Sequence, residues 1–405
     1  MAVPKLRFKA DDGSDYPEWN DFTRLENISA FITKGATPTT YGFDWQPNGV
    51  YFFRNDCIKN NVFVYGDYSF ITEEANKFLQ RSEVTGGDII IAITGDIGKV
   101  GLIPSEVKKG NINQHLARVR IVKNTFPYFV YMYLCSDKVQ RTYKKIKTGL
   151  SMPQLSLAQI RDTNIPVVSL PEQQKITEFL STVDTVIEKQ KATVEAWEER
   201  KKGAMQKLFS QEVRFKADDG SEFPEWEEKK LSEMFKKVVE KNRLDLPALT
   251  IIQGSGTIRR DESERRITYD EKGLKNYKAV HKNDFIVHLR SFEGGLEIAN
   301  QDGIVSPAYH VYRGNDEVNS LFYYPYFRSS NFINGKLSIC VTGVRDGKNI
   351  EMSSFDELLI PHPCFAEQQK IADCLSSLDD VIKKQKATLV AWEEMKKGLL
   401  QQMFV

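Results

Sequence analysis

Two stretches of the chain, 171–203 and 366–398, repeat apolar residues at alternating spacings of four and three, while Glu and Lys occupy most other positions. This heptad pattern is typical of a helix that packs an apolar seam against a second helix. It predicts two long helices that pair with each other; the alternative is that each seam packs on its own domain. The seam positions are Ile176, Leu180, Val183, Ile187, Gln190, Val194, Trp197, Lys201, Ala204 and Leu208 in the first helix, and Ile371, Leu375, Leu378, Ile382, Gln385, Leu389, Trp392, Lys396, Leu399 and Met403 in the second.

The start and the middle of these helices give two further predictions. Ser169 followed by Glu172 predicts a capping box at the start of the first helix, whereas Cys364 at the equivalent position is a weaker cap. Gln190 and Gln385 occupy equivalent seam positions, where a polar residue costs stability but fixes the register. We expect these two glutamines to pair.

The helices are only one part of a tandem duplication. Between 172–209 and 367–404, 24 of 38 positions are identical. The segment RFKADDGSDYPEW at 7–19 likewise recurs as RFKADDGSEFPEW at 214–226. The two offsets are 207 and 195 residues, so the second intervening region is 12 residues shorter. Each half is therefore a variable body followed by a common helix, which suggests a pseudo-symmetric arrangement.

The two bodies alternate apolar and polar residues over short runs bounded by Gly and Asn, which predicts strands in α+β domains. Setting Asp88 against Asp284 aligns GDIIIAITGDIG with NDFIVHLRSFEG, where the apolar alternation agrees and the polar residues differ. Downstream, NQHLARV at 113–119 aligns with VSPAYHV at 305–311. Two bodies of one fold with different polar residues suggest two different ligands; neutral drift after duplication would leave the same difference.

Length and composition fit two globular domains. Of 405 residues, 41% are hydrophobic and 27% charged, and the net charge is +1, as in an ordinary globular protein. The longest aliphatic run, 89–93, is too short to span a bilayer and the N-terminus has no signal-peptide core, so we expect a cytoplasmic protein. The five cysteines form no CxxC pair and are expected to be reduced. We expect a first body at 1–168, a central helix at 169–211, a second body at 212–363 and a C-terminal helix at 364–405.

The sequence contains no motif of a common enzyme, so we expect no catalysis by the chain itself. TGDIGKVG and TGVRDGKN resemble phosphate-binding loops, but their spacing departs from the P-loop and predicts turns. The five histidines have no metal-ligand spacing, and there is no GxSxG motif. The Asn- or Asp-Pro-Pro-aromatic tetrapeptide, with which amino-methyltransferases hold a flipped adenine, is also missing. An enzyme without these motifs stays the alternative.

Basic residues interleaved with aromatic residues predict contact with nucleic acid. They gather in KVQRTYKKIKTG at 138–149 and, in the second body, at Arg259, Arg260, Arg265 and Arg266. Lys and Arg neutralise DNA phosphates, while Arg, Asn, Gln, Ser and His discriminate base edges. Each charged run is also typical of a solvated face. The residues alone thus predict a binding protein with two heads, and the rival interpretation is a coiled-coil adaptor with two protein-binding heads.

Each body ends in an Ile-Pro pair, at 165–166 and 360–361, and Glu-Gln-Gln-Lys-Ile then opens each repeated helix at 172–176 and 367–371. With the order of body, helix, body and helix, these motifs resemble the specificity subunit of type I restriction-modification systems, HsdS. The resemblance extends over nearly the whole chain. It implies an α+β fold of two tandem α/β target recognition domains, separated and joined by two long helices that form an antiparallel coiled coil with a pseudo-two-fold internal repeat.

The resemblance also implies a function for each part. Each domain reads one half of a split double-stranded DNA target, and the coiled coil sets the spacing, because a helix of about 37 residues is roughly 55 Å long and exceeds one DNA turn of ~34 Å. Two methyltransferase subunits dock on the chain and methylate adenine N6 with S-adenosylmethionine, and two restriction and translocase subunits use ATP and Mg. The chain itself binds no cofactor, no metal and no membrane.

The family has no motif for the residues that contact bases, so our candidates come from the aligned turns and the basic stretches. In the first body we predict DNA contacts by Thr94, Lys99, Asn113, Gln114, His115, Lys145 and Lys147. In the second body we predict DNA contacts by Arg259, Arg260, His288, Arg290, Ser291, His310, Arg345 and Lys348.

Overall fold

The computed structural model describes residues 4–122, 124–149, 151–263, 271–288, 295–343 and 349–404. The chain divides into two compact units, each with its own cores. Unit 1 comprises Met1–Lys191 and Ala387–Val405, and unit 2 comprises Ala192–Lys386. Each unit thus contains one body and a half of both long helices, whereas the sequence suggested a separate segment for each helix. The four predicted segment bounds stay a prediction.

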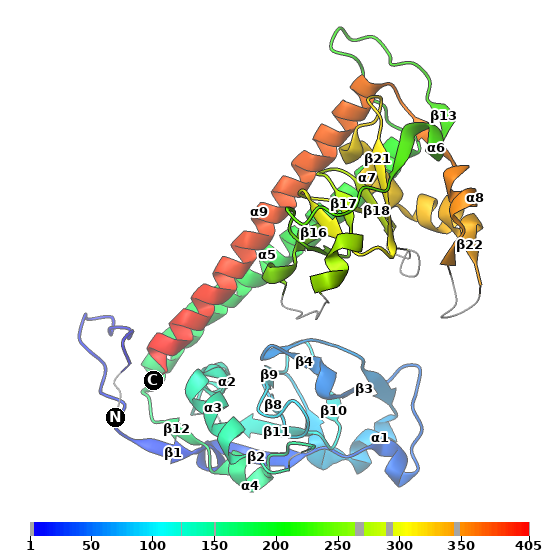
Figure 1. Cartoon of the computed structure of the whole chain (residues 1–405). Coiled ribbons are helices and arrows are strands. Elements are labelled where there is room, and N and C mark those ends of the chain that lie inside the picture. Colours follow the sequence, from blue (N-terminus) through cyan, green and yellow to red (C-terminus); the bar gives the residue numbers. More distant parts are fainter. Residues whose placement is uncertain are drawn as a thin grey trace. The chain divides into compact units, whose positions relative to one another are not determined.

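Unit 1 contains an α+β body (Figure 1). Its strands are β1 Phe22–Arg24, β2 Ser29–Lys34, β3 Val50–Phe53, β4 Ile58–Lys59, β5 Val62–Phe63, β6 Ser69–Ile71, β7 Glu83–Val84, β8 Ile89–Ala92, β9 Val100–Leu102, β10 Gly110–Ile112, β11 Leu116–Ile121 and β12 Asn164–Pro166. Its helices are α1 Glu73–Phe78, α2 Pro127–Cys135, α3 Asp137–Ile146, α4 Leu157–Arg161 and the first half of α5 Leu170–Phe209. Two four-stranded sheets have the orders β6-β3-β10-β7 and β2-β11-β8-β9, and β1 pairs with β12 and β4 with β5.

Strand β8 lies between two hydrophobic cores. Ile89 and Ile91 pack in the core that contains α2, the start of α5 and the end of the C-terminal helix. Ile90 and Ala92 pack in the core that contains β10 and part of β3. A strand covered on both faces requires a continuous apolar run in place of alternation. This requirement explains the run IIIAI in the sequence.

Unit 2 repeats this plan with fewer strands per sheet, since one of its described sheets has four strands and the others have two. Its strands are β13 Glu227–Lys230, β14 Phe235–Val238, β15 Leu249–Ile252, β16 Gly256–Arg259, β17 Lys278–Val280, β18 Phe285–His288, β19 Glu297–Ile298, β20 Gly303–Val305, β21 Tyr309–Gly314, β22 Val341–Thr342, β23 Asn349–Ile350 and β24 Leu359–His362. Its helices are α6 Leu231–Met234, α7 Ser320–Phe327, α8 Met352–Asp356 and the first part of α9 Phe365–Met403. The four-stranded sheet has the order β14-β21-β18-β19, and the pairs are β13-β24, β15-β16, β17-β20 and β22-β23.

The sheets β2-β11-β8-β9 and β14-β21-β18-β19 contain the same buried ion pair at equivalent positions. In unit 1 the Asp88 carboxylate accepts from Arg120 at 2.6 and 2.7 Å and from the backbone N–H three residues earlier at 2.8 Å. In unit 2 the Asp284 carboxylate accepts from Arg313 at 2.8 Å and from the N–H three residues earlier at 2.8 Å. Both carboxylates are 2% exposed, so each needs these donors to be buried as an anion. The predicted alignment of Asp88 with Asp284 is confirmed.

The predicted alignment of 113–119 with 305–311 is wrong by one residue. Val119 lies opposite Ile89 in unit 1, and Tyr312 lies opposite Phe285 in unit 2. Since Ile89 and Phe285 each follow the paired aspartates, Val119 corresponds to Tyr312 and the stretch 113–119 corresponds to 306–312. A slip of one residue exchanges the two faces of a strand.

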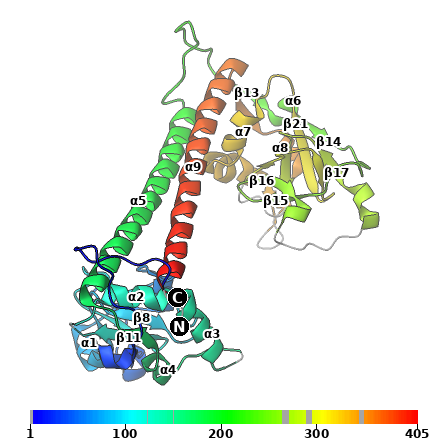
Figure 2. The same ribbon diagram turned by 90° about the vertical axis from the view of Figure 1, so that its left-hand side faces the viewer.

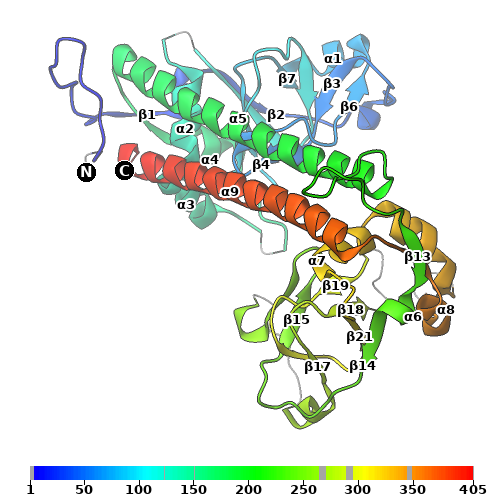
Figure 3. The same ribbon diagram turned by 90° about the horizontal axis from the view of Figure 1, so that it is seen from above.

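The long helices pair antiparallel within each unit (Figures 1 and 3), which confirms the predicted coiled coil. In unit 1 the first half of α5 lies beside the second half of α9, with Asp184 on Lys396 at 2.5 Å and Lys191 on Glu393 at 3.0 Å. In unit 2 the same contacts recur between the other two halves. There Asp379 lies 2.6 Å from Lys201, and Lys386 lies 2.6 Å from Glu198.

The predicted seam residues face inward along both helices. Buried members are Ile176, Leu180, Val183, Ile187, Val194 and Leu208 on α5, and Ile371, Leu375, Ile382 and Met403 on α9. Half-buried members are Gln190, Trp197, Lys201, Ala204, Leu378, Gln385, Leu389, Trp392, Lys396 and Leu399. The pairing of Gln190 with Gln385 stays a prediction.

The predicted capping box is wrong, because the Glu172 carboxylate has other partners. It accepts from Arg7 at 2.9 to 3.0 Å and from the Trp19 indole N–H at 3.1 Å. Ser169 Oγ is buried and, among the described residues, has no hydrogen-bond partner. A buried carboxylate is satisfied better by a guanidinium than by a backbone N–H, since the guanidinium also supplies the opposite charge.

Unit 2 contains the same anchor. The Glu367 carboxylate, which is fully buried, accepts from Arg214 at 2.9 and 3.1 Å and from the Trp226 indole at 2.9 Å. The two repeated motifs found in the sequence therefore contact each other, since Arg and Trp come from the RFKADDGS segment and Glu opens the helix. Each anchor ties a helix to the hairpin that precedes its own body.

Both chain ends belong to unit 1 (Figure 2). The Lys5 N–H donates to the Gln402 carbonyl at 2.8 Å, and Phe404 packs against Trp19 and Phe129 with ring centroids 6.1 and 5.8 Å apart. The end of α9 thus completes the core of the first body. In unit 2 the end of α5 fills the equivalent place, where Phe209 packs on α7.

Candidate nucleic-acid interface

Three loops of unit 1 meet at one end of the sheet β2-β11-β8-β9. Residues 35–37 follow β2, residues 93–99 follow β8, and residues 113–115 precede β11. The Ile93 N–H donates to the His115 carbonyl at 2.9 Å, so the last two loops are bonded to each other. We call these three loops the sheet end of unit 1. It brings together the candidates Thr94, Lys99, Asn113, Gln114 and His115.

Polar side chains of the sheet end form a small network. Gln114 is exposed, its Oε1 accepts from the Thr37 hydroxyl, and its Nε2 lies 3.1 Å from His115 Nε2. Asn113 is buried, and its Oδ1 accepts from the His115 N–H at 3.1 Å. The Thr94 carbonyl accepts from Asn55 at 2.9 Å. Asn113 therefore shapes the loop, while Gln114 and His115 present groups that can hydrogen-bond a base edge.

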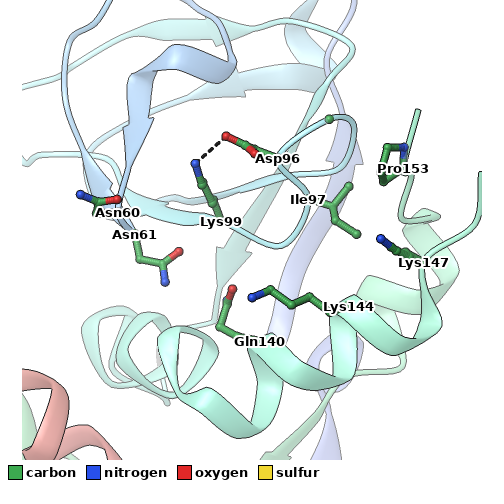
Figure 4. Close-up of a pocket in the computed structure, with 10 residues that line it drawn as sticks. Asn60, Asn61, Asp96, Ile97, Lys99, Gln140, Lys144, Lys147 and Pro153 are labelled. Atoms are coloured by element: carbon green, nitrogen blue, oxygen red, sulfur yellow. Dashed lines mark hydrogen bonds and ion pairs between the residues drawn. The ribbon is translucent and has the colours of Figure 1, made fainter. Parts of the chain in front are cut away.

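A pocket of about 510 Å³ opens beside the sheet end, between the turn that joins β4 to β5 and the helix α3 (Figure 4). Its Lys99 is 2.6 Å from Asp96, which neutralises it. Lys147 also lines this pocket, whereas the candidate Lys145 does not. The remaining lining residues are Asn60, Asn61, Gly95, Ile97, Gln140, Lys144 and Pro153.

Sequence reasoning missed Lys144 and the turn at Asn60 and Asn61. The spacing of Gln140, Lys144 and Lys147 places the three on one face of a helix, and this pattern was available in the sequence. The Asn-Asn pair is equally typical of a tight hairpin turn, and both residues have positive φ, 51° and 59°. What the sequence could not give is that this helix face and this turn lie opposite each other.

The candidates of unit 2 are more dispersed. His288 ends β18 and lies against Tyr309 with ring centroids 5.0 Å apart, at the equivalent end of the sheet. Arg259 follows Ile258 on β16 and is paired with Asp261 at 2.9 Å. Arg260 lies over the Tyr277 ring at 5.5 Å. Arg290, Ser291, Arg345 and Lys348 lie outside the described residues.

His310 occupies a position inside the sheet, because of the register described above. It corresponds to Ala117, which is buried in the core of unit 1. Burial lowers the pKa of His310, and the ammonium groups of Lys278 and Lys237 lower it further. His310 is therefore a neutral imidazole at pH 7, which offers one donor and one acceptor.

A buried carboxylate, Glu297, holds the β15–β16 turn of unit 2. Glu297 accepts from Arg328, from the Tyr324 hydroxyl at 3.0 Å and from the N–H groups of Gly254 and Gly256 at 2.7 and 3.2 Å. Tyr324 corresponds in sequence to the unit 1 tyrosine whose hydroxyl donates to the carbonyl of Asn61 in the β4–β5 turn. The two units thus hold equivalent turns by different polar groups.

A metal site and a membrane span each place requirements on the described residues. No group of three or more His, Cys, Asp or Glu in those ranges is arranged to hold an ion. The five cysteines are free thiols. Within the part of the chain that the structure describes, no helix has the length and apolar character of a membrane span.

Known proteins resemble the chain in sequence and in fold. The family model "Type I restriction modification DNA specificity domain" matches residues 17–196 and 224–390, once for each body. The putative type I restriction enzyme MjaX specificity subunit of Methanocaldococcus jannaschii is 24% identical over 414 residues, which cover 97% of this chain and 94% of that protein.

Two solved structures show the same fold. The S subunit of a type I restriction-modification system from M. genitalium superposes with a TM-score of 0.55 at 15% identity, over 100% of this chain and 99% of that chain. A chain from a study of complex assembly and conformational transition of the type I R-M system gives a TM-score of 0.54 at 17% identity, over 95% and 97% of the two chains. Together with the family model, which matches most of the sequence, these likenesses lead to one assignment. The chain belongs to the family of type I restriction-modification specificity subunits.

Proposed function

We propose that the chain is the DNA-sequence specificity subunit of a type I restriction-modification complex, in which each body reads one half of a split, asymmetric target. One observation supports this most strongly. The two units share the Asp88 and Asp284 ion pairs and the Glu172 and Glu367 anchors, yet the polar groups at their sheet ends differ. A common scaffold with different hydrogen-bonding groups suits two readers of different base sequences.

The antiparallel helices are proposed to set the distance between the two half-sites. α5 has 40 residues and α9 has 39, so each is roughly 60 Å long at ~1.5 Å per residue. Their outer faces share several Glu and Lys positions and would offer two equivalent docking sites for two methyltransferase subunits. Two restriction and translocase subunits would complete the complex.

The chain is proposed to supply recognition without chemistry. S-adenosylmethionine, ATP and Mg would be bound by the partner subunits, and adenine-N6 methylation and cleavage would take place there. The absence from the sequence of the methyltransferase tetrapeptide and of a P-loop agrees with this division. The complex would act in the cytoplasm on double-stranded DNA.

The first test is the salt dependence of DNA binding by the purified chain in complex with its methyltransferase subunits. Contacts to phosphates predict an affinity that falls steeply as salt rises, because each neutralised phosphate releases counterions. Affinity for a protein ligand, with no salt-dependent DNA binding, would favour the adaptor with two protein-binding heads instead.

The second test concerns the spacing. One heptad inserted after Lys191 and one after Lys386, where the two compact units meet in sequence, keeps the seam in phase. We expect the gap between the half-sites to change, or methylation to stop, while each half-sequence is unaltered. A control chain with surface substitutions in the same heptads and no change of length should methylate the original target. An unchanged gap in the lengthened chain would contradict the spacing role.

A further inference from the structure

The pocket beside the sheet end of unit 1 contains uncompensated positive charge. Of its three lysines, Lys99 is paired with Asp96 at 2.6 Å. Lys144 and Lys147 are exposed, and no acidic partner for either is found in the described part of the chain. Their side chains extend from the end of α3 and the residue after it into the pocket (Figure 4). Two ammonium groups at one opening attract an anion.

The opposite wall of the pocket is the turn that joins β4 to β5, which two hydrogen bonds hold in place. Asn61 is held on both sides, since its Oδ1 accepts from the Val100 N–H at 3.0 Å and its carbonyl accepts from the Tyr131 hydroxyl. The neighbouring Asn60 is exposed at the tip of the turn and also lines the pocket. Two lysines therefore bound the pocket on one side, and a fixed turn bounds it on the other.

Unit 2 lacks this pair of charges. Thr148-Gly149 and Thr342-Gly343 end the equivalent segments, with φ of +81° and +83° at the glycines. Lys144 and Lys147 lie five and two residues before Gly149, and the residues five and two before Gly343 are Ser338 and Val341. The turn of unit 2 instead contacts Arg328, whose charge is neutralised by Glu297. Among the described residues, the two positions of unit 2 that correspond to Lys144 and Lys147 are therefore uncharged.

We propose that this pocket binds one backbone phosphate of the DNA, together with its deoxyribose, through Lys144 and Lys147. The inference rests on the proposed function and adds to it a site that holds DNA without reading its sequence. A volume of about 510 Å³ exceeds what a phosphate alone fills, which favours a backbone unit over a free anion. A phosphate held against the 93–99 loop, which is bonded to the 113–115 loop, would fix the register of the base edges that Gln114 and His115 face.

The test compares two variants of the chain in its complex with the methyltransferase subunits. One has Lys144→Gln and Lys147→Gln, and the control has Lys77→Gln and Lys108→Gln, two exposed lysines of unit 1 that do not line the pocket. Affinity for target and non-target DNA is measured from low to high salt. We expect the double variant to lose affinity equally for both DNAs and to reduce the slope of log K against log salt by about 1. The control should match the wild type.

Single methylphosphonate linkages in the DNA then locate the contact. We expect one neutral linkage, in one half-site, to weaken the wild type and to leave the double variant unaffected. Equal slopes for the double variant and the wild type, or an equal loss in the control, would overturn the pocket. A third outcome would also contradict the proposal. If no single linkage matters, but DNA binding is weaker in phosphate buffer than in chloride at equal ionic strength, the pocket binds a free anion. If the wild type itself binds no DNA, the proposed function fails as well.

Discussion

The two units differ at their sheet ends and agree at their anchors. Arg, Trp and Glu form the same buried contact in both, at 2.9 to 3.1 Å. The Gln that follows Glu accepts from the N–H of an N-cap residue, that of α2 for Gln173 at 3.0 Å and that of α7 for Gln368 at 2.8 Å. At the sheet ends, by contrast, Gln114 of unit 1 corresponds to Pro307 of unit 2, which has no polar side chain.

This comparison separates two kinds of residue. Those that fix a body to the helices are the same in both units, because one geometry must be produced twice. Those that lie beyond the strand ends differ, because the scaffold does not depend on them. The Glu-Gln-Gln-Lys-Ile motif is therefore structural at four of its five positions. Glu172 is the anchor, Gln173 bonds the backbone of the body, Lys175 donates to the hairpin carbonyl of Lys9 at 2.8 Å, and Ile176 lies in the core.

Breaking the anchors should produce the largest effect, and an equal one in both units. Arg7→Ala and Arg214→Ala each leave a buried glutamate without its counter-charge, so we expect each to destabilise its own unit by about 3–5 kcal/mol. Hydrogen exchange of the two units measures the loss separately. Arg24→Ala is the control, since its pair with Asp162 is about half exposed and should cost about 1 kcal/mol or less. A much smaller loss of stability in one unit than in the other would contradict the claim that the two anchors are equivalent.

Changing the sheet end should affect one half-site only. Gln114→Ala removes an exposed donor and acceptor, and we expect a loss of about 1–3 kcal/mol in discrimination at one position if this side chain bonds a base. Methylation of a library of target variants by the complex reports both half-sites together. Gln80→Ala, an exposed glutamine away from the sheet end, should leave the preferences unchanged. Changes in both half-sites would contradict independent bodies.

Removing an inter-helix ion pair should reduce stability least, and the loss should be slightly larger in unit 1 than in unit 2. Lys396 and its partner Asp184 have side chains 16% and 27% exposed, and Asp184 also accepts from Tyr128 at 2.6 Å. Lys201 and Asp379 are 23% and 57% exposed. We expect Lys396→Ala to cost about 1 kcal/mol and Lys201→Ala a few tenths (~0.3), since solvent screens the second pair more. Urea unfolding followed by hydrogen exchange checks the order, and the reverse order would contradict it.

The sequence predicted features that depend on local periodicity. The heptad spacing located both helices, and the repeats identified two bodies of one fold. It did not predict the partner of Glu172, because Arg7 is 165 residues away and the local pattern of Ser169 and Glu172 fitted a cap equally well. The alignment error of one residue at His310 likewise comes from a contact that is distant in the sequence. A short alternating strand fits two registers, and only pairing with β18 distinguishes them.

The candidate site was predictable to the level of loops and less so to the level of side chains. The loops after β8 and before β11 were identified because polar residues follow buried strands there. Lys145 was chosen and Lys144 was not, because the face of α3 that meets the β4–β5 turn depends on how Val139 and Tyr143 pack. That packing is a tertiary property.

The most direct measurement is a genome-wide map of N6-methyladenine in cells that express the chain and in a matched deletion, with the methyltransferase subunits present in both. The account predicts that the deletion removes one asymmetric motif made of two unlike half-sites separated by a fixed gap, and that Gln114→Ala relaxes one half of that motif only. Identical maps with and without the chain, in cells where the methyltransferase subunits are active, would contradict the claim that its two bodies select the DNA sequence.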